Sequence, residues 1–121
     1  MDDTAKIDFI TALARIVEDH KGTDIIALDI STSCSWTDFF LITTTSSQAH
    51  VKGLLKHIKE YLSLNGVEII HRRKHLAEEG WVLIDCGFMV IHIMSEDMRK
   101  FYELEKLWHN GIILYHSSKS S

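Results

Sequence analysis

The segment 81–94 restricts the fold more than any other part of this sequence. Two apolar runs rich in β-branched residues, WVLID and FMVIHIM, flank the dipeptide Cys86-Gly87. A connection this short joins only antiparallel strands, so the segment predicts a β-hairpin. In the simplest register Asp85 pairs with Phe88 across the turn.

This pairing predicts two different hairpin faces, because successive side chains of a strand point to opposite sides. One face is wholly apolar and is expected in the core; it consists of Val82, Ile84, Met89, Ile91 and Ile93. The other mixes aromatic, acidic and imidazole side chains; it consists of Trp81, Leu83, Asp85, Phe88, Val90, His92 and Met94. Solvent-facing strands seldom expose large aromatics, and buried strands seldom take an unpaired Asp. This mixed face therefore either binds another protein or is covered by the last helix, with Trp81 and Phe88 as core residues.

The hydrophobic period predicts further elements on both sides of the hairpin. Residues 4–20 carry an apolar stripe at helical spacing, and a second stripe follows Ser46 and Ser47, either of which can cap a helix. Three more strands are predicted at residues 24–30, 38–45 and 67–71. Ser95 caps a final helix with a buried stripe of Met98, Phe101, Tyr102, Leu104, Leu107 and Trp108. The fold class is thus α/β, of α+β type, in the order α-β-β-α-β-β-β-α, with a mixed sheet of about five strands and three helices.

Length and composition indicate one globular domain. The chain has 121 residues, of which 45% are hydrophobic and 25% charged. We expect a single domain at residues 1–108 and a C-terminal tail at 109–121. No apolar run approaches the roughly 20 residues that span a bilayer, so no membrane partner is expected. The chain starts without a visible secretory signal and has two cysteines but no disulfide framework, which predicts a cytoplasmic protein.

The charge balance excludes a protein that binds nucleic acid through a global basic field. Thirteen Lys and Arg face seventeen Asp and Glu, giving a net charge of -4. If the chain acts near RNA, it is expected to dock on a basic protein there.

A metal site is disfavoured. His71 and His75 have the i, i+4 spacing of a metal-binding pair, but Arg72, Arg73 and Lys74 lie between them and oppose a dication. A solvated turn is the favoured interpretation, so no metal or other cofactor is expected. The same basic cluster is a candidate contact with the phosphates of RNA at the edge of such a docking site.

Catalytic chemistry is also disfavoured. Asp29, Asp38 and Asp85 occur singly, whereas nucleotidyl transfer needs clustered carboxylates that hold Mg²⁺. Cys34 has no evident His or Asp partner, and Cys86 at the turn suits an apolar contact as well as it suits reactivity. We therefore do not expect an enzyme.

Three motifs in fixed order carry a family resemblance: DIIALDISTSCSWTDFFLITTTSSQ, GWVLIDCGFMVIHIM and RKFYELEKLW. Together they resemble the ribosomal silencing factor family, also called RsfS or Iojap, over about residues 4–108. The resemblance implies a compact domain of nucleotidyltransferase-like topology. It also implies binding to the large ribosomal subunit through its fourteenth ribosomal protein, which blocks subunit joining and represses translation. Organellar relatives act in large-subunit assembly, which is the alternative function.

The resemblance also implies which residues bind the partner. The predicted partner-binding set is Trp81, Asp85, Cys86, Gly87, Phe88 and His92. Trp81 matches the family's hairpin tryptophan and is the expected anchor, while Asp85, Gly87 and His92 match its acidic, glycine and histidine positions. Phe88 departs from the family, which usually has Asp there, and replaces a charge by an apolar contact. The matching positions of the closing helix are expected to be mainly structural; they are Arg99, Tyr102, Leu104, Glu105, Leu107 and Trp108. A homodimer through the same hairpin face is an alternative for the free chain.

Overall fold

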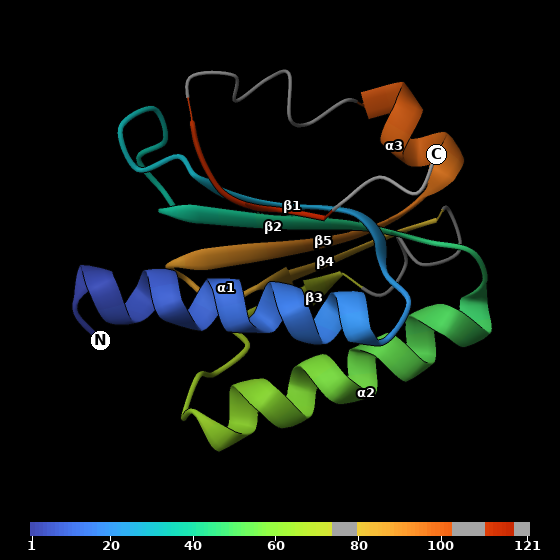
Figure 1. The fold of residues 1–121 in the computed structure, drawn as a ribbon, viewed down its shortest axis with the longest axis horizontal. Coiled ribbons are helices and arrows are strands. Elements are labelled where there is room, and N and C mark those ends of the chain that lie inside the picture. Colours follow the sequence, from blue (N-terminus) through green and yellow to red (C-terminus); the bar gives the residue numbers. More distant parts are fainter. Residues whose placement is uncertain (74–79, 103–110, 118–121) are drawn as a thin grey trace.

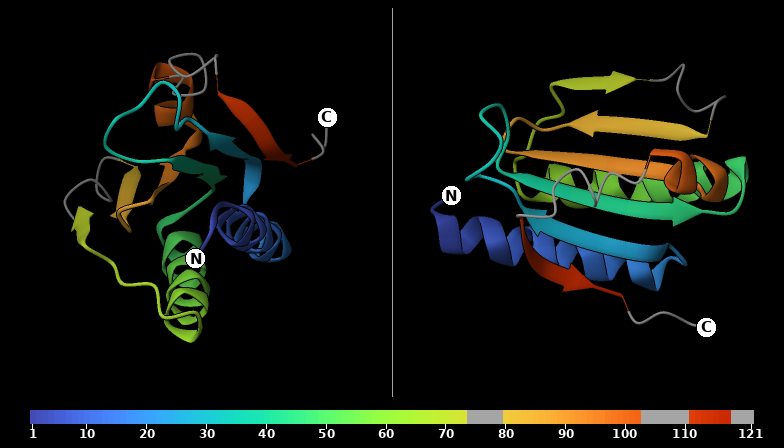
Figure 2. Two further views of the ribbon diagram at one scale, coloured as in Figure 1. Left: turned by 90° about the vertical axis from the view of Figure 1, so that its left-hand side faces the viewer. Right: turned by 90° about the horizontal axis from the view of Figure 1, so that it is seen from above.

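The computed structural model describes residues 1–73, 80–102 and 111–117, which form a mixed sheet with helices on both faces. The elements are α1 (Asp3–Asp19), β1 (Thr23–Asp29), β2 (Phe39–Thr45), α2 (Gln48–Leu64), β3 (His71–Arg73), β4 (Trp81–Asp85), β5 (Met89–Ser95), α3 (Glu96–Tyr102) and β6 (Ile112–His116). The strand order is β3-β4-β5-β2-β1-β6. Helices α1 and α2 cover one face of the sheet and α3 lies on the other (Figures 1 and 2). The predicted α+β class with a mixed sheet is confirmed.

The two long helices form because each combines a capped start with an apolar stripe. The Asp2 carboxylate accepts the Ala5 N–H at 2.8 Å, and the Ser47 hydroxyl accepts the His50 N–H at 3.1 Å. Their stripes are buried: Phe9, Ile10, Leu13, Ala14 and Val17 of α1, and Leu54, Leu55, Ile58 and Leu62 of α2. Among the described helices, none has the length and apolar character that a membrane span requires.

The sheet is mixed because β2 and β5 lie parallel at its centre. Phe39 lies opposite Met89 and Thr45 lies opposite Ser95, so both strands end at the same edge of the sheet. The other neighbouring pairs are antiparallel.

The predicted hairpin is formed by β4 and β5, but its predicted register is wrong by two residues. Asp85 lies opposite Val90 and not opposite Phe88. The reason is a longer connection, in which the Cys86 N–H donates to the Met89 carbonyl at 2.8 Å. A shift of two keeps the alternation of the strands. The apolar face is therefore in the core as predicted, and Val82, Ile84, Met89, Ile91 and Ile93 are all buried.

The longer connection also moves Phe88 away from the mixed face. Its ring packs against Phe9 of α1 and Phe39 of β2, with centroids 6.0 and 6.4 Å away. These neighbours belong to the core under α1 and α2. The prediction that Phe88 shares a face with Trp81 is wrong, because Phe88 lies in the connection and not in the strand ladder.

The rest of the mixed face is partly core. Val90, His92 and Met94 are buried, whereas Trp81 and Leu83 are only half-buried at the margin. A second core on the α3 side of the sheet holds the apolar members; it consists of Ile26, Leu28, Ile30, Cys34, Phe40, Ile42, Val90 and Met94. Neither sequence alternative therefore holds for the whole face, since its centre is covered and its margin at β4 is open.

Two strands differ from the sequence prediction. β3 begins at His71, where the predicted strand ends. Residues 112–116, predicted as part of a tail, form β6, which pairs antiparallel with β1 and makes the sheet six-stranded instead of five-stranded. The Tyr115 hydroxyl lies 2.5 Å from a carboxylate oxygen of Glu18 and ties this strand to α1. The predicted helix positions Leu104, Glu105, Leu107 and Trp108 lie outside the described residues.

Candidate docking surface

The predicted partner-binding residues fall into two groups at opposite ends of the hairpin. Trp81 begins β4 and lies near His92, whereas Asp85 ends β4 and leads into the turn at Cys86–Phe88. Because a strand advances about 3.3 Å per residue, the length of β4 separates Trp81 from the turn by about 13 Å. The six residues therefore do not form one cluster of touching side chains, and their role in partner binding stays a prediction.

Trp81 and His92 are joined by a hydrogen bond between their rings. The Trp81 Nε1–H donates to His92 Nδ1 at 3.2 Å, and the ring centroids are 5.8 Å apart. An indole nitrogen can only donate, so Nδ1 is unprotonated and the neutral imidazole carries its proton on Nε2. His92 is only 4% exposed. It therefore orients Trp81 while presenting almost no surface of its own.

The surroundings of His92 keep it uncharged. Its ring makes a T-shaped contact with the Phe40 ring at a centroid distance of 4.7 Å, and its Nε2 has no hydrogen-bond partner in the described part of the chain. Burial, and after it the positive charge of Arg99, lower the pKa of His92 to about 3. The bond to Trp81 is accordingly maintained at neutral pH.

Two aromatic residues of α3 extend the exposed surface beyond Trp81. The Tyr102 ring lies 4.8 Å from the Trp81 ring, and the Phe101 ring lies 5.0 Å from Tyr102. Tyr102 is 43% exposed and Phe101 is 79% exposed. We call Trp81, Phe101 and Tyr102 the aromatic patch. The prediction that Phe101 and Tyr102 are buried is wrong, and none of the α3 residues is buried. Their adjacency was the available signal, because neighbouring positions of a helix point in directions about 100° apart and cannot both lie at the centre of one buried stripe.

A close backbone contact fixes α3 beside Trp81. The Ser95 N–H donates to the Gly80 carbonyl at 2.6 Å, and the Ser95 hydroxyl caps α3 by accepting the Met98 N–H at 3.2 Å. Gly80 has a φ of +84°, and a Cβ there would lie 2.5 Å from the Ser95 hydroxyl oxygen. The predicted cap at Ser95 is confirmed, and the geometry of the aromatic patch depends on Gly80.

At the other end of the hairpin, the predicted residues make contacts within the turn. The Asp85 carboxylate accepts the Gly87 N–H at 2.8 Å, and Gly87 has a φ of +87°. Cys86 is 7% exposed, and burial together with the charge of Asp85 raises the pKa of its thiol to about 11. The thiol is therefore protonated at neutral pH and a poor nucleophile.

Among the described residues, the remaining candidates make ordinary polar contacts. Asp29 accepts hydrogen bonds from Ser31, and Asp38 pairs with Lys6 at 3.9 Å. No three His, Cys, Asp or Glu side chains of the described residues are grouped to hold a metal ion. Arg72 and Arg73 lie in β3, while Lys74 and His75 lie outside the described residues.

A cavity of about 190 Å³ lies beside Trp81, at the edge where β2 and β5 end. Its described lining is Thr45, Ser46, Ser47, Gln48, Val51, Gly80, Trp81, Val82, Ile93 and Ser95. Ligands of open α/β sheets bind at such an edge, and nucleotidyl transfer there needs carboxylates to hold Mg²⁺. This described lining contains none.

A family model and individual relatives of this chain indicate the same protein family. The family model "Ribosomal silencing factor during starvation" matches residues 3–120. The ribosomal silencing factor RsfS of Bacillus subtilis is 35% identical over 95 residues, covering 78% of this chain and 80% of that protein. That of Treponema pallidum is 32% identical over 104 residues, covering 85% and 92%. A mouse protein named for mitochondrial assembly of the ribosomal large subunit is 30% identical over 115 residues, covering 86% of this chain and 46% of that protein.

Solved structures agree with the sequence relatives. A crystal structure of a Chromobacterium violaceum protein superposes with a TM-score of 0.75 at 34% identity, covering 95% of this chain and 90% of that one. A Bacillus halodurans structure gives a TM-score of 0.70 at 30% identity, covering 88% and 95%. With the family match spanning nearly all of the sequence, this chain belongs to the ribosomal silencing factor family.

Proposed function

We propose that this chain binds the large ribosomal subunit through its fourteenth ribosomal protein, with the aromatic patch at the centre of the interface. The observation that carries the proposal is the exposure of this patch. Tyr102 and Phe101 are 43% and 79% exposed. The Tyr102 ring contacts the Trp81 ring, and the Phe101 ring contacts the Tyr102 ring. Burying aromatic side chains of this kind supplies much of the free energy of protein association.

The proposed mechanism is steric exclusion, which requires no chemistry. A bound domain occupies space that the small subunit needs, so subunits cannot join and translation is repressed. A standard interface buries roughly 1,200–2,000 Å² in total, which a domain of this size can share. The net charge of -4 favours encounter with a basic ribosomal protein.

The other residues predicted to bind the partner are proposed to surround the aromatic patch. Arg72 and Arg73 lie in β3, the edge strand next to β4, and together with Lys74 they are proposed to reach nearby ribosomal RNA. The turn at Asp85–Phe88 is proposed as the rim of the interface, where contacts contribute less free energy. A homodimer of the free chain through the aromatic patch would compete with ribosome binding.

A second candidate function is assembly of the large subunit from the same docking site. It is favoured by the mouse relative, whose name states a role in mitochondrial large-subunit assembly. The cavity beside Trp81 does not favour a nucleotide-transferring enzyme, because its described lining offers no carboxylate.

The deciding experiment adds the purified chain to separated ribosomal subunits and follows 70S formation on a sucrose gradient. The chain should comigrate with the large subunit and suppress joining. Trp81→Ala should weaken binding by about 2–4 kcal/mol, as truncated aromatic anchors do. Leu64→Ala removes an equally apolar side chain, 85% exposed at the far end of α2, and should bind like the parent. Equal binding by the folded Trp81→Ala variant would refute the proposed centre.

A further inference from the structure

Two cavities adjoin at the edge of the sheet where β2 and β5 end. The first is the cavity of about 190 Å³ beside Trp81, and the second has a volume of about 360 Å³. Thr45 and Ser46 line both of them. From this edge the chain leaves β2 for α2 on one face of the sheet and leaves β5 for α3 on the other face (Figures 1 and 2). Ligands of open sheets bind at such a point, where adjacent parallel strands lead to opposite faces.

The first cavity suits the aliphatic part of a ligand. Three elements build its apolar wall, with Val51 from α2, Val82 from β4 and Ile93 from β5. Its described lining contains no charged side chain, so a charged group placed there would lose its hydration without gaining a partner. Its volume is several times the roughly 30 Å³ that one water molecule occupies in the liquid, and a short branched chain therefore fits.

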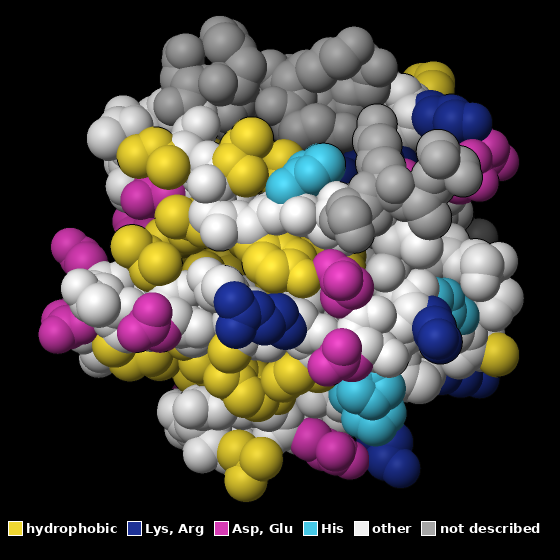
Figure 3. Space-filling view, viewed as in Figure 1, with side chains coloured by type: hydrophobic (Ala, Val, Ile, Leu, Met, Phe, Trp, Pro, Cys, Tyr) yellow, Lys and Arg dark blue, Asp and Glu magenta, His cyan; other side chains and the backbone are white. Residues whose placement is uncertain are grey.

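The second cavity suits an anionic group. Lys21 lines it, and the Thr44 hydroxyl in its wall accepts a hydrogen bond from the Arg99 guanidinium at 3.0 Å. Glu96 also lines it, but the Glu96 carboxylate pairs with Lys100 at 3.3 Å. In the space-filling view, the right-hand end of the molecule, where β2 ends, shows Lys or Arg and His side chains on a largely polar surface (Figure 3). Lys21 and Arg99 thus leave an excess of positive charge at this cavity.

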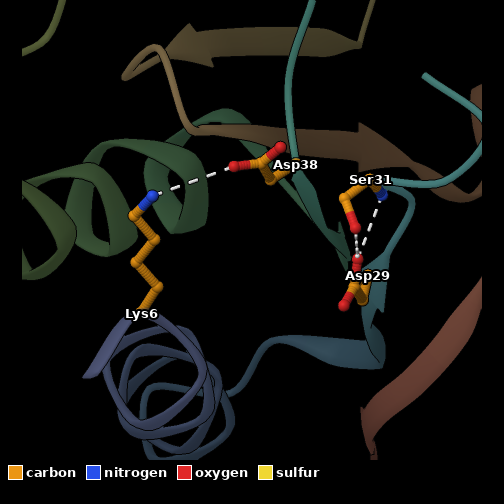
Figure 4. A network of polar contacts seen from close by, with 4 residues as sticks. All are labelled: Lys6, Asp29, Ser31 and Asp38. Atoms are coloured by element: carbon orange, nitrogen blue, oxygen red, sulfur yellow. Dashed lines mark hydrogen bonds and ion pairs between the residues drawn. The ribbon is translucent and has the colours of Figure 1, made fainter. Parts of the chain in front are cut away.

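Neighbouring acidic side chains stand outside the two cavities. Asp19 and Asp24 are close to Lys21 in sequence but do not line either cavity. Asp29 and Asp38 each have a polar partner and stand at the opposite end of the sheet (Figure 4). The length of β2 places these two about 20 Å from the cavities, and exposed charges are screened beyond about 8 Å at physiological ionic strength.

Thr45 lies between the two cavities with an unused hydroxyl. The residue is only 7% exposed, and none of the described residues forms a hydrogen bond with its hydroxyl group. A hydroxyl that is this buried and lacks a partner costs free energy. A ligand that spans both cavities would supply the missing partner.

We propose that the two cavities form one binding site for a small anion with a short branched aliphatic body. The anionic head lies beside Lys21 and the Thr45 hydroxyl, and the body lies against the aliphatic wall of the first cavity. A carboxylate and a phosphate monoester share this chemistry, and the test below distinguishes them. The inference does not depend on ribosome binding.

The test titrates the full chain with isocaproate and with isoamyl phosphate in an isothermal calorimeter. At least one of these anions should bind with a Kd of about 1 mM or tighter, and the tighter one identifies the head group. Two partial ligands serve as comparisons: acetate has the head without the body, and isohexanol has the body without the charge. Each should bind at least tenfold more weakly than the better anion.

Two variants test the two halves of the site. Lys21→Met should weaken binding of the better anion about tenfold, and Val51→Phe should weaken it as much by filling the first cavity from α2. The matched controls are Lys52→Met, on the exposed side of α2, and Val67→Phe, which lines a different cavity beyond the end of α2. Both controls should bind like the parent. Circular dichroism verifies that all four variants are folded.

Three results would overturn the proposal. One is the absence of binding heat with both anions at concentrations well above the expected Kd. Another is unchanged affinity in both folded site variants. The third is acetate binding as tightly as isocaproate, which would show an adventitious ion only. Because no ribosome is present in the titration, failure of the proposed ribosomal function leaves these outcomes unaffected.

Discussion

The indole N–H of Trp81 donates to Nδ1 of His92, and this bond can exist only while His92 is uncharged. A protonated imidazole carries hydrogen on both nitrogens and would set one N–H against another. Burial and the nearby charge of Arg99 lower the pKa of His92 to about 3. The half-buried Trp81, the proposed anchor of the aromatic patch, is thus oriented by a residue that does not titrate near neutral pH.

Acid should destabilise the protein through His92. An unfolded histidine binds a proton below about pH 6.5, whereas His92 in the native state does so only near pH 3. The unfolded state therefore holds more protons between these values, and the free energy of unfolding falls as pH falls through that window. His92→Gln retains an acceptor for Trp81 but does not titrate. Between pH 7 and 4.5 it should lose about 2–3 kcal/mol less stability than the parent in urea unfolding. Parallel losses would contradict the assignment.

The proposed function predicts that Phe101→Ser weakens binding to the large subunit without lowering stability. Phe101 is 79% exposed, so its removal opens no cavity in the core. We expect a loss of about tenfold in affinity, measured by cosedimentation with purified large subunits. Leu64→Ser, at 85% exposure on α2, is the control and should leave the affinity unchanged. Normal binding by the Phe101→Ser variant would show that Phe101 of α3 does not contribute to the interface.

Gly80→Ala should cost more stability than Gly66→Ala. Both glycines have positive φ, +84° and +68°, which costs an alanine about 1–2 kcal/mol. Only at Gly80 would the new Cβ also meet another residue, at 2.5 Å from the Ser95 hydroxyl oxygen, while Gly66 faces open space. We expect an additional loss of about 1–3 kcal/mol in chemical unfolding. Tryptophan emission should also change in Gly80→Ala, because the residue precedes Trp81. Equal losses of unfolding free energy in the two variants would show that the Ser95 side chain moves away from the new Cβ without loss of stability.

Tyr115→Phe should loosen β6 from α1. The Tyr115 hydroxyl donates to Glu18 at 2.5 Å, and this hydrogen bond, more than burial or charge, raises the pKa of Tyr115 to about 12. Removing the hydroxyl should cost about 1 kcal/mol of stability. In a titration of tyrosine absorbance, the group that ionises last in the parent should be missing from the variant. In Glu18→Gln, Tyr115 should ionise at a lower pH than in the parent. If its pKa were the same in both proteins, Glu18 would be excluded as the cause of the raised pKa.

The sequence was sufficient where a periodic pattern coincided with burial. The stripes of α1 and α2 and the alternation of β4 and β5 predicted the elements correctly, because one buried face selects one period. The capping role of Ser95 was also predictable from the sequence, because its hydroxyl accepts a hydrogen bond from an N–H group only three residues later.

The sequence was insufficient where a connection or a distant strand decided the outcome. The conformation at Cys86–Phe88 set the hairpin register and turned Phe88 toward α1, and neither follows from alternation. Residues 112–116 are too short a run to distinguish from a tail until β1 is known to need a neighbour. The exposure of Phe101 depended on how α3 sits on the sheet, which is fixed by the Gly80–Ser95 contact.

The pairing of β1 with β6 also orders events during synthesis. The Ile25 N–H bonds to the Ser117 hydroxyl, 92 positions later. The edge of β1 that pairs with β6 therefore stays unpaired until nearly all of the described chain has been synthesised. A truncated product that ends before Ile112 would leave this edge of β1 exposed, and the exposed edge could pair with other truncated copies.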